Sequence, residues 1–270
     1  MTVEQSEASR LGPIFDACHR DNRAALIGYL PTGYPDVATS VGGMIALVES
    51  GCDIIEVGVP YSDPGMDGPT IARATEVALH GGVRVRDTLA AVEAISAAGG
   101  HAVVMTYWNP VLRYGVDAFA RDLASAGGRG IITPDLIPDE AQQWLAASEE
   151  HRLDRIFLVA PSSTPERLAA TVGASRGFVY AASTMGVTGA RDAVSQAAPE
   201  LVSRVRAVSG IPVGVGLGVR SREQAAQIGS FADGVIVGSA LVSALSEGLP
   251  ALRALTEELA AGVRQRASAT

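Results

Sequence analysis

The chain has 270 residues, 47% of them hydrophobic, with a formal net charge of −8 and a pI near 5.0. This acidic balance argues against a protein that binds nucleic acids or anionic membranes, and the length is enough for a large core without disulfides or metals. No apolar run reaches about 18 residues, so no transmembrane span is expected. The polar start MTVEQSEASR is not a signal peptide. We therefore expect a cytoplasmic protein.

The hydrophobic pattern alternates between short apolar runs and longer segments with helical spacing. An N-terminal helix is expected over about residues 6–22, and eight strand–helix units over about residues 24–265. The expected strands are residues 24–30, 53–57, 102–105, 130–133, 155–159, 178–181, 212–215 and 234–237. The expected helices after them are residues 37–50, 69–80 with 85–98, 116–126, 139–150, 165–172, 193–208, 222–228 and a long helix from Leu241.

Strands that alternate with helices pair in parallel, because crossover helices and not hairpins join parallel neighbours. No linker or composition shift divides the chain. Eight such units in about 240 residues fit an α/β fold of the (β/α)8 TIM-barrel type. The sequence therefore predicts one TIM-barrel domain, residues 1–270, with an extra N-terminal helix. The loops that follow the strands open on one face of such a barrel, and its chemistry is expected there.

The stretch from Ile54 to Pro69, IIEVGVPYSDPGMDGP, places a carboxylate inside an apolar strand. Burying a charge costs free energy unless the charge is paired, neutralised or used. The pKa of Glu56 should therefore be raised, which suits a general acid. Asp63 and Asp67 lie on the following loop. Either one could accept a hydrogen bond from a substrate N–H or cap the helix near Pro69. Asp63, next to Pro64, could instead order the loop, and a Mg²⁺ site of these carboxylates stays open.

Two glycine-rich loops late in the chain predict a phosphate site. Strands seven and eight run into VGVGLGVRS and VGSALV, and a helix follows each at once. Glycine lets backbone N–H groups approach a ligand, and a helix N-terminus adds partial positive charge. Phosphate is often held by these two loops in TIM barrels. Gly218, Gly238 and Ser239 are the expected donors; tight turns alone would explain the same glycines.

The segment STMGVTGARD, residues 183–192, follows the sixth strand and is polar and rich in glycine. Loops of this kind often act as lids that exclude water. Thr188 and Gly189 are placed to reach the same phosphate, because strand six neighbours strand seven. Tyr180, within strand six, fits either a core position or the lining of the pocket. Cys18 and Cys52 lack the spacing of a metal site and are expected to be small buried thiols.

Four of these motifs together resemble the tryptophan synthase alpha family. They are EVGVPYSDPGMDGP at residues 56–69, GVTG at residues 186–189, the Gly-x-Gly after strand seven and VGSA after strand eight. The resemblance implies a lyase that cleaves indole-3-glycerol phosphate to indole and glyceraldehyde 3-phosphate in tryptophan biosynthesis. Gly65 and Met66 stand where this family usually has Leu-Ala, which predicts a more flexible loop when the partner is absent.

The resemblance also implies roles for individual residues. Glu56 would protonate the indole ring carbon, and Asp67 would accept the indole N–H and balance the developing charge. Substrate contacts are implied for Tyr29, Ile71, Met105, Ile132, Tyr180 and Thr188, and phosphate contacts for Gly189, Gly218, Gly238 and Ser239.

The same resemblance implies a partner. The family's alpha subunit docks on a pyridoxal-phosphate beta subunit in an αββα heterotetramer and passes indole through a tunnel, and it carries no cofactor or metal of its own. The loop after strand two and the loop Tyr107–Pro110 would lie at that interface.

Two other functions stay open on the sequence. One is another phosphate-binding barrel enzyme, and the other is a subunit that only activates its partner. All 21 basic residues are arginine, which excludes a Schiff-base lysine. A module that only binds has no use for the carboxylate of Glu56 in an apolar strand.

Overall fold

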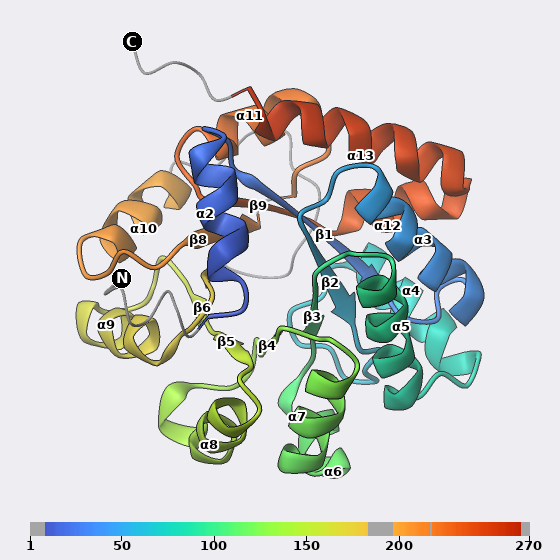
Figure 1. Ribbon diagram of the computed structural model, residues 1–270, viewed down its shortest axis with the longest axis horizontal. Helices are drawn as coiled ribbons and strands as arrows, with labels where there is room; N and C mark the ends of the chain where they lie inside the picture. Colours follow the sequence, from blue (N-terminus) through green and yellow to red (C-terminus); the bar gives the residue numbers. More distant parts are fainter. Residues whose placement is uncertain (1–8, 183–196, 217, 266–270) are drawn as a thin grey trace.

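The computed structural model describes residues 9–182, 197–216 and 218–265. Its core is a sheet of nine parallel strands in the order β5-β4-β3-β2-β1-β9-β8-β7-β6 (Figure 1). The strands are β1 (Ala25–Pro31), β2 (Ile54–Gly58), β3 (Ala102–Met105), β4 (Gly130–Ile132), β5 (Asp154–Ile156), β6 (Leu158–Val159), β7 (Val179–Ala182), β8 (Val213–Gly216) and β9 (Gly234–Val237). This is the predicted α/β barrel.

The two edge strands of this sheet are consecutive in the chain. β5 pairs with β4, and β6 pairs with β7, with Phe157 alone between them. The sequence predicted one strand over residues 155–159, and the structure divides it. The backbone changes partner at Phe157, so the chain itself joins both edges and brings the sheet round into a barrel.

Helices surround the sheet. They are α2 (Gly12–Arg20), α3 (Val37–Glu49), α4 (Pro69–His80), α5 (Val85–Ala97), α6 (Trp108–Tyr114), α7 (Val116–Ser125), the 3-10 helix η1 (Pro138–Glu140), α8 (Gln142–Glu150), α9 (Pro165–Ala174), α10 (Ala197–Arg206), α11 (Arg222–Gly229), α12 (Ser239–Glu247) and α13 (Leu249–Val263). None of the helices in the described part of the chain is long and apolar enough to cross a membrane.

Three helix predictions were wrong in part. The expected long helix from Leu241 is two helices, α12 and α13, because Gly248 adopts a positive φ of 110° between them and Pro250 follows. The segment 139–150 is divided into η1 and α8. The loop after β3 contains the short helix α6, whose first amide, Trp108 N–H, donates to both carboxylate oxygens of Asp135 at 2.9 and 3.1 Å.

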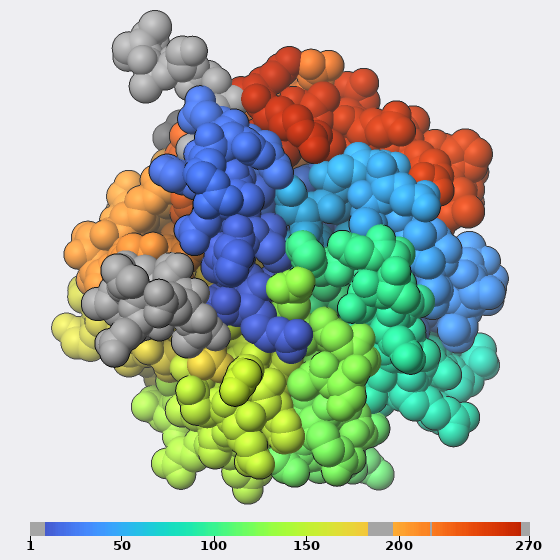
Figure 2. All heavy atoms as spheres, viewed as in Figure 1, coloured from blue at the N-terminus to red at the C-terminus, as the bar shows by residue number. Residues whose placement is uncertain are grey.

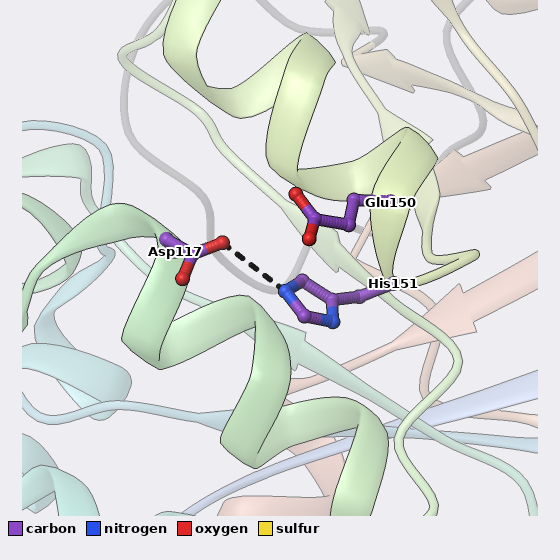
Figure 3. A group of neighbouring side chains, drawn as sticks. All are labelled: Asp117, Glu150 and His151. Atoms are coloured by element: carbon purple, nitrogen blue, oxygen red, sulfur yellow. Dashed lines mark hydrogen bonds and ion pairs between the residues drawn. The ribbon is translucent and has the colours of Figure 1, made fainter.

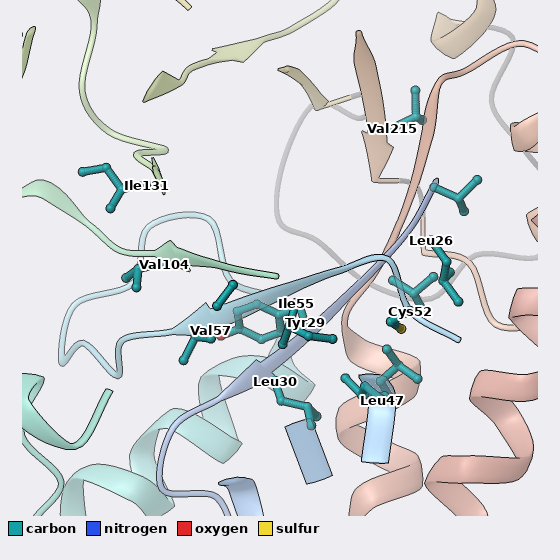
Figure 4. Packing of buried hydrophobic residues seen from close by; sticks show 14 of the residues in the cluster. Leu26, Tyr29, Leu30, Leu47, Cys52, Ile55, Val57, Val104, Ile131 and Val215 are labelled. Atoms are coloured by element: carbon teal, nitrogen blue, oxygen red, sulfur yellow. The ribbon is translucent and has the colours of Figure 1, made fainter. Parts of the chain in front are cut away.

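The strands alternate between two cores. One face of the strands points into the barrel, where it forms the inner cluster. The other face packs under the helices, and Figure 4 shows part of that outer cluster. The strand members of the inner cluster are Ala25, Ile27, Ile54, Val103, Ile132, Ile156 and Ile236, and Phe178 lies directly before β7. The outer face includes Leu26, Leu30, Ile55, Val57 and Val104.

Helix α2 closes the end of the barrel where the strands begin, and Figure 2 shows it in blue across the middle of that face. Leu11, Phe15 and Cys18 are buried against the inner cluster, and the rings of Phe15 and Phe178 lie 5.6 Å apart. The predicted helix over residues 6–22 is therefore present as α2, from Gly12 to Arg20. With this end filled by side chains, access to the interior is left to the opposite mouth, where the strands end.

Candidate active site at the mouth of the barrel

Glu56 lies in the middle of β2 and points into the barrel. Its neighbours in register are Tyr29 on β1 and Val103 on β3, and Val103 belongs to the inner cluster. The side chain is 2% exposed, and its Oε1 atom has no hydrogen-bond partner in the described structure. Burial raises the pKa of Glu56 to about 8. A carboxyl group in this state holds a proton near neutral pH and has room to give it to a ligand.

Asp67 approaches the same mouth from the β2–α4 loop, residues 59–68. Burial raises the pKa of its carboxyl group, while a hydrogen bond from Tyr107 lowers it. The Tyr107 hydroxyl donates to Asp67 Oδ1 at 3.4 Å. Asp63, in contrast, accepts from the neighbouring Ser62 hydroxyl at 2.6 Å in an exposed part of the loop. Of the explanations left open for Asp63, this contact favours ordering of the loop.

Two tyrosines share the interior with these carboxylates. Burial raises the pKa of both Tyr29 and Tyr180, and the negative charges of Glu56 and Asp67 raise each of them further. Tyr180 lies on β7, half-buried and packed against the inner cluster. Tyr29 is the neighbour of Glu56 in register, and Tyr180 is only partly buried where it packs on the inner cluster, so its position favours pocket lining over a purely core role.

Glycines let the two phenol rings lie flat against neighbouring strands. A Cβ atom at Gly58 would lie 2.5 Å from the Tyr29 hydroxyl oxygen, and one at Gly216 would lie 2.5 Å from the Tyr180 hydroxyl oxygen. Any side chain at either position would displace the ring. Gly58 and Gly216 thus shape the mouth, although neither residue was predicted from the sequence as part of the site.

The predicted phosphate donors lie on the adjacent loops. Gly218 adopts a positive φ of 66° after β8, and Gly238 is the N-cap of α12, whose first residue is Ser239. A Cβ atom at Gly238 would lie 3.5 Å from both Ile71 Cδ1 and Tyr29 Cδ1. The free N–H groups of the first turn of α12 therefore lie beside the apolar lining of the mouth, an arrangement that suits a ligand with one anionic and one apolar end.

The remaining predicted pocket residues are placed by strand register. Met105 pairs with Gly58 and with Ile132 at the ends of their strands. Ile132 is fully buried in the inner cluster, and Ile71 is buried on α4. Thr188 and Gly189 lie outside the described residues.

Tyr107 contacts the β2–α4 loop, which was not predicted from the sequence. The sequence placed this residue only at a partner interface. Its hydroxyl accepts a hydrogen bond from the Met66 amide at 2.9 Å, and its ring stacks on Tyr61 with centroids 5.2 Å apart. The available signal was its position two residues after β3, the strand that pairs with the one carrying Glu56. A side chain at Gly65 would meet no atom within 4 Å, so packing does not require glycine at this point of the loop.

One group of three side chains in the described ranges has the composition of a metal site, and it lies on α7 and α8. It consists of Asp117, Glu150 and His151, whose ligand atoms are within 4.8 Å of one another (Figure 3). His151 Nε2 lies 3.2 Å from Asp117 Oδ1, and both carboxylates are exposed. This is the geometry of a surface ion pair between two helices. The loop carboxylates Asp63 and Asp67 form no such group within the described part of the chain, which gives no support to the Mg²⁺ alternative.

Comparison with known proteins agrees with this geometry. The family model described as tryptophan synthase alpha chain matches residues 15–270. The chain belongs to the tryptophan synthase alpha chain family. The alpha chain of Mycobacterium avium is 88% identical over 271 residues, and that of Mycobacterium tuberculosis H37Rv is 87% identical over 269 residues; each alignment covers 100% of both chains.

Solved structures give the same assignment. A chain of Mycobacterium tuberculosis tryptophan synthase superimposes with a TM-score of 0.93 at 88% identity, covering 95% of this chain and 98% of that chain. The alpha chain of Legionella pneumophila superimposes with a TM-score of 0.87 at 30% identity, covering 96% and 99%. As a member of the tryptophan synthase alpha chain family, the protein catalyses the alpha reaction of tryptophan biosynthesis, the lyase cleavage of indole-3-glycerol phosphate, and its partner is the beta subunit.

Proposed function

We propose that Glu56 is the general acid and base of this cleavage and that Asp67 stabilises the charge that develops on the indole nitrogen. The observation that carries the proposal is the burial of Glu56 at the barrel mouth, with a pKa raised to about 8. The experiment that tests it is the Glu56→Gln variant treated in the Discussion.

The roles follow from the chemistry of the substrate. Protonation of the indole C3 atom by Glu56 places a positive charge on the ring nitrogen. Asp67 accepts a hydrogen bond from the ring N–H and balances that positive charge. This interaction is stronger in the transition state than in the ground state, because the charge has developed there. The bond between C3 and the glycerol carbon then breaks, the electron pair returns to the ring, and the carbon's hydroxyl becomes an aldehyde as Glu56 takes up its proton.

The rest of the mouth binds and orients the substrate. Tyr29, Ile71, Met105, Ile132 and Tyr180 form the dry apolar pocket that an indole ring needs. The phosphate is held by backbone N–H groups of Gly218 and Gly238 and by Ser239, which begins α12 at its positive end. Of these residues, Ile71 lies in the first turn of α4, and the others lie within a strand or within two residues of a strand's end.

The Asp67→Asn variant tests the second role. The carboxamide still accepts a hydrogen bond but carries no negative charge, so kcat is expected to fall roughly 10²–10³-fold. The measurement is indole release in the presence of the beta subunit. The matched control is Asp63→Asn on the same loop, which is expected to retain activity within about twofold. Equal losses in both variants would contradict a specific role for Asp67.

The pH dependence of the reaction tests the protonation state of Glu56. A general acid must hold its proton, and the pKa of Glu56 is about 8. We therefore expect kcat/KM to decrease as pH rises through about 8. A profile that stays level up to pH 9.5, at constant protein stability, would rule out a protonated Glu56 as the acid.

The assembly implied by this function is an αββα heterotetramer in the cytoplasm. The β2–α4 loop and the segment Tyr107–Pro110 would contact the beta subunit, which would supply pyridoxal phosphate for the next step and receive indole through a tunnel. The alpha-chain chemistry proposed above uses acid, base and electrostatic groups of this chain, consistent with a subunit that carries no cofactor of its own.

A further inference from the structure

Tyr107 connects the β2–α4 loop to the rigid frame of the barrel. The loop places three residues on this one side chain: Met66 donates its amide to the hydroxyl, Asp67 accepts from it, and Tyr61 stacks on the ring. The first two contacts span 41 and 40 positions of the chain. A single hydroxyl thus acts as acceptor and donor for two consecutive loop residues.

Tyr107 itself is fixed from both sides. The buried Thr106 hydroxyl donates to the Tyr107 carbonyl at 2.9 Å. On the other side, the Trp108 amide is held by Asp135, and the Asn109 amide group donates to the Tyr61 hydroxyl at 3.4 Å. The Tyr107 side chain is 8% exposed. Little freedom is left to this residue, so it serves as a fixed support for a loop that has no regular secondary structure.

The Tyr107 contacts determine where the Asp67 carboxylate lies, and this is the group proposed to meet the substrate. Asp67 lies next to Met66, and a loop residue keeps its place only if its backbone is held. The Met66 contact fixes the backbone one residue before Asp67, while the Asp67 contact orients the carboxylate itself.

We propose that Tyr107 is a positioning residue of the alpha reaction, which fixes the β2–α4 loop through its hydroxyl so that Asp67 meets the indole nitrogen. This inference rests on the role proposed for Asp67. Tyr107 contacts Asp67 and the loop backbone and takes no part in proton transfer. Its hydroxyl acts through Asp67, and its ring, with Tyr61, gives the loop a surface to pack on.

The test is the Tyr107→Phe variant, which removes the hydroxyl and retains the ring. Loss of a hydrogen bond to a charged group predicts that kcat/KM for indole release falls about tenfold with the beta subunit present. In an Asp67→Ala background the same substitution should cost less than about twofold, because no carboxylate is left for the Tyr107 hydroxyl to orient. A tenfold loss in both backgrounds would overturn the proposal.

A second readout needs no catalysis. Hydrogen exchange of the Met66 amide should become faster in Tyr107→Phe. Unchanged exchange would overturn the proposal for Tyr107. This readout does not depend on the roles proposed for Glu56 and Asp67, so the two proposals can fail separately. The matched control is Tyr114→Phe, since the Tyr114 hydroxyl also donates to an aspartate, Asp122, at 2.7 Å. This control should retain indole release and the wild-type exchange of Met66. A loss of activity equal to that of Tyr107→Phe would count against a specific role for Tyr107.

Discussion

Replacing Glu56 with glutamine is expected to lower the rate of indole release roughly 10²–10⁴-fold, the contribution of a well-placed acid and base. Glutamine has nearly the same size and is neutral, like the protonated acid that burial favours. It has no proton to give to the indole carbon and cannot accept one from the glycerol hydroxyl. Indole release from indole-3-glycerol phosphate, measured with the beta subunit present, checks the result. Turnover within about threefold of the wild-type value would exclude Glu56 as the acid.

The same variant carries a control for folding. A carboxyl group whose pKa is raised in the folded state costs stability as pH rises from its unfolded pKa toward its folded pKa. For Glu56 that window runs from the ordinary value of 4.5 to about 8. The glutamine variant should therefore unfold like the wild-type protein near pH 4.5 and be more stable than it near pH 9. Loss of activity together with higher stability at alkaline pH separates a chemical role from damage to the fold.

The order of strands and helices could be predicted because it depends on local pattern. Short apolar runs and segments of helical period place the eight expected units, and the structure agrees with most of their bounds. The division of residues 154–159 at Phe157 could not be predicted, because a change of pairing partner leaves no mark on a run of apolar residues. The break at Gly248 was readable in principle, since Pro250 follows it closely.

The site shows a similar division. Glu56 was predictable because a carboxylate conflicts with the apolar strand around it. The contact between Tyr107 and the β2–α4 loop joins residues about 40 positions apart, and it depends on how two loops bend after neighbouring strands. Gly58 and Gly216 are required only because Tyr29 and Tyr180 lie across them. The roles of Thr188 and Gly189 stay predictions, since both lie outside the described residues.

The opposite end of the barrel offers the second large effect, because the buried carboxylate of Asp154, the first residue of β5, is hydrogen-bonded by the N-terminal segment and also pairs with Arg176. The Asp154 carboxylate is fully buried and accepts hydrogen bonds from the Leu11 amide at 2.8 Å and the Ser9 hydroxyl at 2.9 Å. Arg176 Nε lies 3.4 Å from its other oxygen. Asp154→Ala is expected to lower the free energy of unfolding by about 3–5 kcal/mol, because it removes the buried acceptor of the Leu11 amide and the Ser9 hydroxyl and one of the two carboxylates that pair with Arg176. Urea unfolding at pH 7 measures the loss.

Asp117→Ala is the matched control for Asp154→Ala, since it removes the exposed carboxylate that contacts His151 between α7 and the end of α8. A surface pair is screened by water, so this variant should unfold at nearly the wild-type urea concentration. Similar small losses of stability in both variants would show that the closed end of the barrel is held by apolar packing of α2 and not by the Asp154 contacts. A large loss of stability confined to Asp154→Ala, with indole release unchanged per folded molecule, would show that the Asp154 contacts stabilise the barrel independently of the chemistry at its mouth.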